Sequence, residues 1–370
     1  MSKTEALTLK RREPLTDTNL LFTITVCVFV GMYALSMLIF GGKFLTVQQF
    51  LDLFNNNAFL IIIACGLSMV MVVGGIDISV GGITALVAMS CVFFLDSGFA
   101  SGLGGGGSVL GSLVLALTIG LGFGLLHGVL VALLDIQPFI VTLSGMFLAR
   151  GLTTIISVNP YTAKNTAFLT LKNLRIELPG LGRTIAKTGA YIPATIELGV
   201  LIALVVVLVA FVILKWSRFG RNLYAVGGNN QSALMLGINV KRTKFFAYLA
   251  SGLLAGIAGY VYLLHTGSGD AAHATAAEMK AIASSIIGGT LLTGGVGNVI
   301  GTLFGALTLM TIDQIVLSSP LTGAWWQDIT TGAMLCFFIL LQSVVLSRRH
   351  GSKMKLALPE WLKFKKKSTT

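Results

Sequence analysis

The chain of 370 residues is 55% hydrophobic and only 11% charged, and its net charge is +12. Soluble domains carry about 25% charged residues, so this composition argues against a large soluble helical protein, which needs more polar surface to cover its core. The basic charge is explained more simply by membrane topology and anionic lipid headgroups than by binding of nucleic acid.

Long apolar runs recur along the whole chain. As a helix, about 20 apolar residues cross a hydrocarbon core of about 30 Å and satisfy their own backbone groups. The first run, residues 20–40, is too long for a signal peptide and lacks a cleavage site, so we interpret it as a retained span. The pattern predicts an all-α polytopic membrane protein with about ten transmembrane helices, near residues 21–40, 58–73, 79–96, 109–134, 136–158, 196–214, 245–265, 279–293, 296–317 and 325–346.

Three basic segments predict the orientation: the N-terminal tail 1–20, the loop 215–244 and the C-terminal tail 348–370. Because basic segments stay in the cytoplasm, both termini and this loop are expected there, which requires an even number of spans between them. Six spans followed by four meet this requirement and leave residues 21–347 as the transmembrane domain. The loop 159–195 is then external although it carries five basic residues, which conflicts with the rule.

Two glycine-rich strings, 73–82 and 287–297, interrupt the apolar runs. In each, a hydroxyl residue follows the leading glycine by five positions, which suggests duplicated halves. Chain breaks free backbone groups to line a cavity, so the strings predict broken or re-entrant spans. The candidate residues of a translocation pathway or gate are Asn57, Gly74, Gly75, Asp77, Ser79, Thr290, Thr293 and Asn298.

Asp77 is the sharpest of these candidates, because an ionisable group at membrane depth is costly and marks function. The structural alternative is that Asp77 caps the start of the next helix through the amide of Ser79 or Val80. His127 and Asp313 also lie in apolar runs, and we expect each to be an interhelical hydrogen-bonding or a snorkelling residue rather than a member of a proton relay.

Glycines at four-residue spacing predict close helix packing, within one subunit or between subunits. They are Gly120, Gly124 and Gly128, then Gly252 and Gly256, then Gly297, Gly301 and Gly305. The glycine-rich stretch 102–108 is expected to be a flexible loop. The four cysteines sit in apolar runs without CxxC spacing or paired histidines, so no metal or redox site is predicted.

The basic loop 215–244 contains a predicted short helix of about two turns. Asn229 or Asn230 can cap it and Gly237 can end it. Lying parallel to the membrane with Ala233, Leu234 and Leu236 available, it would be a docking element for a cytoplasmic partner, and an ordinary loop between spans is the alternative.

No enzyme motif appears, so no catalytic residue is predicted. The chain lacks G-x-x-x-x-G-K-[ST] and cannot itself hold ATP phosphates in that way. A G-x-S-x-G elbow and H-E-x-x-H are also missing from the sequence.

Four motifs in order resemble the permeases of ribose-type sugar ABC importers, at 74–81, 227–240, 251–259 and 287–303. The stretch 143–151 fits the same family, and the pair Trp325-Trp326 favours the galactofuranose-type permeases. The resemblance implies a type II-like permease of the bacterial inner membrane. Two such subunits, identical or paired with a sister subunit, would form the pore for a monosaccharide.

The same resemblance implies two further partners. A cytoplasmic ATPase would use ATP and Mg²⁺, so this chain would bind no cofactor, and a periplasmic binding protein would deliver the sugar. The loop helix would be the coupling helix that contacts the ATPase, through Gly228, Asn229, Asn230, Ala233, Leu234 and Gly237.

The sequence departs from the family pattern at several positions. Lys280 stands where the family often has an acidic residue, Ser232 where it often has alanine, and Leu234 where it often has a basic residue. The loop 97–108 is also longer. The alternative functions are an ion-coupled secondary transporter of a small polar solute, and a membrane-embedded enzyme or assembly scaffold.

Overall fold

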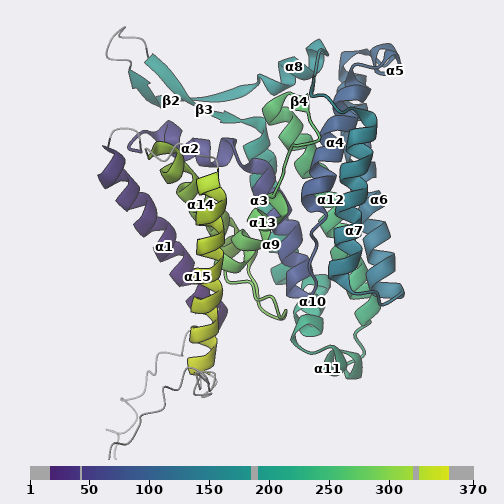
Figure 1. The fold of residues 1–370 in the computed structure, drawn as a ribbon, viewed down its shortest axis with the longest axis vertical. Coiled ribbons are helices and arrows are strands. Elements are labelled where there is room, and N and C mark those ends of the chain that lie inside the picture. Colours follow the sequence, from purple (N-terminus) through teal and green to yellow (C-terminus); the bar gives the residue numbers. More distant parts are fainter. Residues whose placement is uncertain (1–16, 42–43, 185–190, 320–324, 350–370) are drawn as a thin grey trace, which may run out of the picture.

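The computed structural model describes residues 17–41, 44–184, 191–319 and 325–349 (Figure 1). Most of the two predicted tails, residues 1–16 and 350–370, therefore lies outside the described residues. The helices of the bundle are α1 (Asp17–Phe40), α3 (Ala58–Val72), α4 (Val80–Leu95), α6 (Gly104–Gly128), α7 (Pro138–Ile156), α9 (Leu198–Trp216), α12 (Val240–Thr266), α13 (Ala277–Ile287), α14 (Val299–Ser318) and α15 (Trp325–Arg349). The remaining ones are α2 (Val47–Asn55), α5 (Gly98–Gly102), a π-helical turn η3 (Val129–Leu133), α8 (Thr166–Lys172), α10 (Arg218–Gly228) and α11 (Asn230–Met235).

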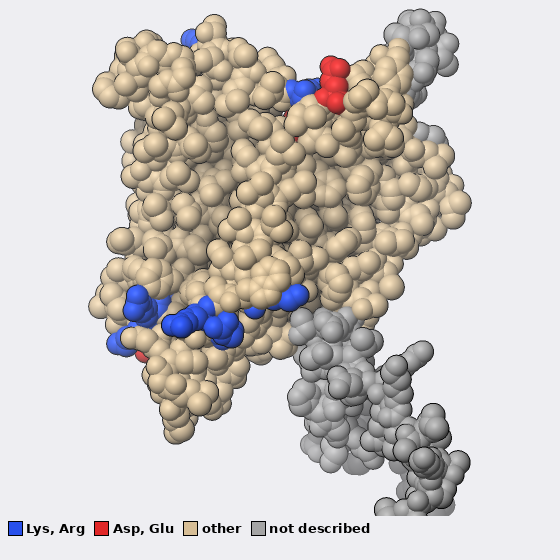
Figure 2. Space-filling model, turned by 180° about the vertical axis from the view of Figure 1, so that it is seen from behind, with Lys and Arg blue, Asp and Glu red and all other residues tan. Residues whose placement is uncertain are grey.

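The long helices run side by side and leave two ends (Figure 1). One end carries α2, α5, α8 and a β-hairpin, and the other carries α10 and α11. We call these the hairpin end and the α11 end. Figure 2 shows one face of the molecule, where Lys and Arg gather near the α11 end below a broad belt without charged side chains. That distribution is the one expected of a bundle that crosses a membrane.

Every predicted span contains a helix, but about ten full spans are not confirmed. Among the described residues, six helices are long and apolar enough to cross a membrane, and α2 with α3 makes a seventh if the pair, bent by 53°, is one span. By contrast, α4 has only 16 residues and α13 only 11. The shortfall has a structural reason: irregular chain, rather than helix, forms part of the path before each of these two helices.

The expectation of an all-α protein is wrong at the hairpin end. Strands β2 (Arg175–Thr184) and β3 (Tyr191–Glu197) pair antiparallel, with Arg175 opposite Glu197. A second, two-residue pair joins β1 (Tyr161–Thr162) to β4 (Ser268–Gly269). The open edges of β2 and β3 are compatible with this fold because this hairpin lies at the end of the helical bundle, where water can satisfy the free backbone groups.

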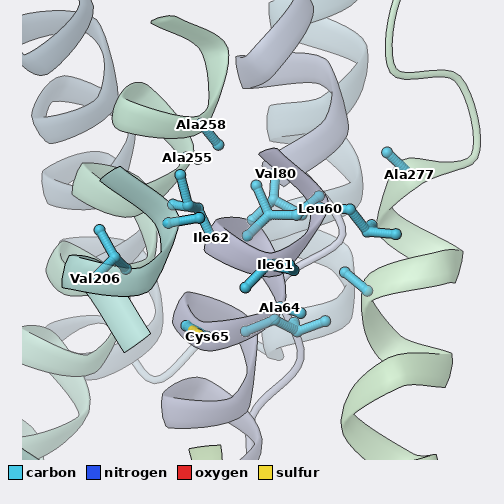
Figure 3. Packing of buried hydrophobic residues seen from close by; sticks show 14 of the residues in the cluster. Leu60, Ile61, Ile62, Ala64, Cys65, Val80, Val206, Ala255, Ala258 and Ala277 are labelled. Atoms are coloured by element: carbon cyan, nitrogen blue, oxygen red, sulfur yellow. The ribbon is translucent and has the colours of Figure 1, made fainter. Parts of the chain in front are cut away.

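The core centres on α3. All residues of α3 except Phe59 are buried, as expected of a helix that is apolar on every side. Figure 3 shows its side chains packed against residues of four other helices, namely Val80, Val206, Ala255, Ala258 and Ala277.

Close packing at the four-residue glycine faces is confirmed, and it occurs within this chain. A Cβ on Gly120 of α6 would lie 2.8 Å from the Cα of Gly256, and a Cβ on Gly252 of α12 would lie 2.5 Å from the Cα of Gly124. Backbones can approach this closely only where side chains are missing. The predicted flexible loop at 102–108 is wrong, since α6 begins at Gly104, where Gly105 packs beneath Ala167 of α8.

Candidate functional site

Helices α3 and α13 end in the same hydrogen-bonded turn. In both, the residue after the C-cap is a glycine in the left-handed region, with φ of +85° at Gly74 and +90° at Gly289. The two bonds of a Schellman motif follow in each case. Each is 2.9 Å long: Gly74 N–H to Met71 O, Gly75 N–H to Val70 O, Gly289 N–H to Ile286 O and Thr290 N–H to Ser285 O. The predicted likeness of the two glycine strings is therefore also a likeness of backbone geometry.

After α3 the chain turns back into the bundle. Tyr248 Oη of α12 donates to Ile76 O over 3.4 Å, and Ser251 Oγ donates to Asp77 Oδ2 over 2.7 Å. Ser251 is the twelfth of the 27 residues of α12. The segment 73–79 is thus re-entrant, and α4 begins near the middle of the bundle.

Asp77 is fully buried, and both of its carboxylate oxygens accept hydrogen bonds. Oδ1 accepts from the amide of Ser79 at 3.0 Å and from its hydroxyl at 2.5 Å, while Oδ2 accepts from Ser251. Asp77 therefore does bond to the start of α4, through Ser79 and not Val80. A role in gating stays a prediction.

His127 of α6 lies next to this network. Its Nδ1 is 3.4 Å from Ser79 Oγ, and its Nε2 has no hydrogen-bond partner within the described part of the chain. The predicted interhelical hydrogen bond of His127 is confirmed, since Ser79 lies at the start of α4.

A second re-entrant segment, residues 268–276, enters from the hairpin end and was not predicted. A Cβ on Gly269 would lie 2.7 Å from Met89 Cα, and a Cβ on Gly81 would lie 3.0 Å from Ala274 O. Between these contacts the segment passes along α4, from Met89 towards the first turn of α4. Ala274 and Ala276 have φ of +50° and +59°, an unfavourable region for alanine.

Arg150 of α7 holds this segment in place. Its guanidinium donates to three carbonyl oxygens, those of Ala271 at 2.8 Å, His273 at 2.6 Å and Ala274 at 2.9 Å. Such a fork of donors suits a series of turns whose carbonyls would otherwise be left unpaired.

The two re-entrant segments bring the starts of α4 and α13 together. Glu278 lies in the first turn of α13, is buried, and contacts Gly81 in the first turn of α4. Its Oε2 has no hydrogen-bond partner among the described residues. Two helix starts that meet inside a bundle are typical of transporter sites, because their free N–H groups face inward. Glu278 was not among the predicted site residues.

The two predicted groups of residues, pathway and coupling, meet at the α11 end. The amide of Gly295 donates to Val72 O over 2.9 Å. A Cβ on Gly295 would lie 2.8 Å from Gly228 Cα, and a Cβ on Gly294 would lie 2.9 Å from Gly74 N. We call these contacting residues the glycine junction: Gly74, Gly227, Gly228, Gly294 and Gly295.

A mainly polar cavity of about 360 Å³ opens beside the glycine junction. Its lining comes from the break after α3, from the end of α10 with the start of α11, and from the string before α14. The predicted site residues that share this cavity are Gly74, Gly228, Asn229, Asn230 and Thr293. Tyr224 Oη also donates to Gly297 O over 2.9 Å, which adds a further contact between α10 and the second string.

Helix α11 projects from the molecule next to this cavity. Asn229, rather than Asn230, caps it by accepting from the amide of Ser232 at 2.9 Å, and Gly237 with φ of +78° follows its end. Leu234, Met235 and Leu236 are 59%, 87% and 78% exposed. The expectation that Ala233 is available to a partner is wrong, because it is buried against the chain.

The remaining predicted residues lie apart or have local roles. Asn57 sits at the bend between α2 and α3 and donates to Leu53 O over 3.2 Å, so it is not at the junction. Asn298 caps α14 by accepting from the amide of Ile300 at 3.0 Å. Thr290 is buried, and its hydroxyl has no partner in the described ranges.

Acidic groups compensate part of the basic charge in the loop 159–195. Glu197 lies 2.7 Å from Nδ1 of His265 and 3.4 Å from Arg175. Burial raises the pKa of Glu197, but the hydrogen bond from His265 and the charges of His265, Arg175 and Lys172 outweigh burial, so the pKa lies below its usual value. The conflict with the topology rule stays, because that rule counts Lys and Arg, and acidic residues contribute little to it.

No group of three or more His, Cys, Asp or Glu side chains suited to a metal ion occurs in the described ranges. The four cysteines are free, and Cys65 and Cys91 are buried in the core.

Residues 49–339 match the family described as "Branched-chain amino acid transport system / permease component". The chain belongs to this permease family. Its members are transporter subunits rather than enzymes, and the chain is accordingly a multi-pass membrane protein. No solved structure matches the chain.

Several curated relatives match over most of their length. The inner membrane ABC transporter permease protein YjfF of Escherichia coli is 38% identical over 337 residues, which are 90% of this chain and 96% of the relative. The fructose import permease protein FruG of Bifidobacterium longum is 35% identical, over 87% of this chain and 90% of the relative. The autoinducer 2 import system permease protein LsrC of Yersinia enterocolitica is 33% identical, over 79% of this chain and 74% of the relative. The predicted resemblance to sugar ABC importer permeases is confirmed.

Proposed function

We propose that the chain is the transmembrane subunit of an ATP-driven importer and that its cargo is a monosaccharide. The named cargoes of FruG and LsrC support an importer of small sugar-like solutes. The structural observation that carries the proposal is the glycine junction, which links the exposed helix α11 to the breaks after α3 and before α14.

In this proposal α11 is the coupling helix. Its exposed side chains Leu234, Met235 and Leu236 would seat in an apolar groove of a cytoplasmic ATPase. The ATPase, and not this chain, would bind ATP and Mg²⁺. The α11 end would face the cytoplasm with both termini, and the hairpin end would meet a periplasmic binding protein.

The glycine junction would transmit movement of α11 into the bundle. Its contacts involve backbone atoms of all three segments, so α10 and α11 cannot shift without displacing at least one of the two breaks. The breaks would allow this movement, because two helices joined by irregular chain can change the angle between them, whereas one continuous helix cannot.

The experiment reconstitutes the permease with its ATPase and binding protein in proteoliposomes. Leu234→Glu places a charge on the docking surface, and Gly237→Pro forces a backbone with φ of +78° towards about −65°. We expect both variants to insert normally while ATP hydrolysis no longer drives sugar uptake. Leu181→Glu, the same change at a half-exposed position of the hairpin, is the control for assembly alone and should still bind the ATPase, because the hairpin lies at the opposite end from α11.

Two results would contradict the proposal. Normal uptake in both variants would remove the coupling role of α11. Uptake by the permease alone, in vesicles without ATP but with a proton or sodium gradient, would instead support an ion-coupled transporter.

A further inference from the structure

An ion pair lies between two helices within the apolar part of the molecule and is not accounted for by the coupling mechanism. Lys280 Nζ of α13 and Asp313 Oδ2 of α14 are 2.8 Å apart. Asp313 is five residues from the end of α14, so it lies about 7.5 Å inside that helix. Lys280 follows Glu278 by two positions and therefore projects from roughly the opposite side of α13.

The pair is incompletely enclosed. The side chains of Lys280 and Asp313 are 24% and 18% exposed, and the neighbouring Met279 is 51% exposed. In hydrocarbon, charged side chains are costly and therefore face a water-filled cavity or another protein surface. This side of α13 and α14 is consequently not a lipid-facing surface.

The pair also retains unused hydrogen-bonding capacity. Asp313 Oδ1 is buried and has no hydrogen-bond partner within the described residues. Next to Asp313 in sequence, Gln314 accepts a hydrogen bond of 3.0 Å from Gln49, which joins α14 to α2.

We propose that Lys280 and Asp313 form a subsite that binds hydroxyl groups of a neutral sugar as it passes along this face. An ammonium group donates to sugar oxygens, and a carboxylate accepts from two hydroxyls, while the pair itself has no net charge to trap the cargo. The inference rests on the proposed function, and it assigns the cargo to the α13 and α14 side of the bundle.

The first experiment measures sugars transported per ATP hydrolysed in the reconstituted importer. The probes are radiolabelled D-fructose, D-galactose and D-ribose and their deoxy analogues. We expect Asp313→Asn and Lys280→Met to lower the ratio about tenfold for the transported sugar, because each loses a hydrogen bond to a charged group. ATP hydrolysis stimulated by the binding protein should persist.

The charge-swapped double variant Lys280→Asp/Asp313→Lys separates binding from simple helix pairing. It keeps an ion pair between α13 and α14 but exchanges donor and acceptor positions. We expect normal abundance with a reduced ratio and an altered preference among the deoxy analogues. Restoration of the wild-type ratio and preference would show that the pair only joins the two helices, and would overturn the subsite.

Cysteine labelling gives an answer that does not depend on transport. In a background lacking Cys27 and Cys336, Lys280→Cys should react with a charged thiol reagent and be protected by the transported sugar in the assembled importer. Met279→Cys, one position away, should not be protected. Equal behaviour of the two would contradict the subsite, whereas absence of ATP-driven uptake in the wild-type complex would contradict the proposed function itself.

Discussion

Asp77 satisfies three donors in the middle of the bundle, from Ser79 and Ser251. Asp77→Ala leaves them facing a small void, and a buried donor without a partner costs about 1–3 kcal/mol. Since hydroxyl groups can rotate towards other acceptors, we expect a loss of about 2–4 kcal/mol in unfolding free energy. Thermal unfolding of the purified protein measures this loss.

The same variant tests gating at Asp77. We expect uptake per mole of inserted protein to fall further than abundance does. Asp77→Asn is the matched control, since its amide oxygen still accepts from Ser79. If uptake and abundance fall together in Asp77→Ala, the carboxylate serves only to fix the start of α4.

Glu197 gives the hairpin end a pH dependence. Its pKa is lower in the folded protein than the usual value of about 4.3. Its stabilising effect is therefore complete above about pH 4.3 and is lost as the pH falls through the lower, folded pKa. The melting temperature of the wild type should exceed that of Glu197→Gln at pH 6, and this difference should shrink towards pH 3. A constant difference would exclude the carboxylate charge as its source.

At the scale of elements, the glycine junction offers two adjacent positions with opposite expectations. A Cβ on Gly227 would lie 2.6 Å from Gly295 N and even closer to Val72 O, whereas a Cβ on Gly228 meets nothing within 4 Å. Gly227→Ala should separate α10 from both breaks at a cost of about 1–3 kcal/mol and reduce ATP-driven uptake at least tenfold. Gly228→Ala should stay within about twofold of the wild type.

Sugar uptake and the amount of bound ATPase are both measured for Gly227→Ala and Gly228→Ala. The expected signature is retained binding of the ATPase with lost transport in Gly227→Ala alone. Equal uptake in the two variants would show that the close backbone contact at Gly227 does not transmit movement from α11 into the bundle.

The elements that sequence predicted best are those with local chemical markers. The glycine pair at 74–75 predicted the end of α3, and Asn229 with Gly237 bounded α11, because capping and left-handed turns depend on the residue at the position itself. The match of the two strings also extended to their hydrogen bonds. The predicted span 279–293 was too long, since α13 ends at Ile287 and a turn follows.

The elements that sequence missed depend on distant partners. Segment 268–276 consists mainly of small residues, and what holds it is Arg150, more than 120 positions earlier in the chain. Hydropathy along the chain cannot reveal that partnership. Ala233 was misplaced for a similar reason: its burial depends on the fold around α11, not on the helix pattern.

At the scale of the whole molecule, cysteine labelling tests the proposed orientation of the hairpin end and the α11 end. Met235 is 87% exposed on α11, and Leu181 is 50% exposed on the hairpin. With Cys27 and Cys336 removed, Leu181→Cys should react with an impermeant maleimide in intact cells, and Met235→Cys should react only in inside-out vesicles from cells that lack the ATPase. Reaction of both from the same side would contradict the proposed orientation and the external position of 159–195.

The glycine junction has a consequence for how such a permease can diversify. Its contacts are made by backbone atoms, which are the same in every sequence that keeps glycine there. Residues that touch cargo, such as the proposed pair Lys280 and Asp313, belong to other surfaces. Selection for a new sugar can thus alter side chains along the path while the glycine junction remains unchanged. The same coupling to the ATPase can then serve permeases that carry different sugars.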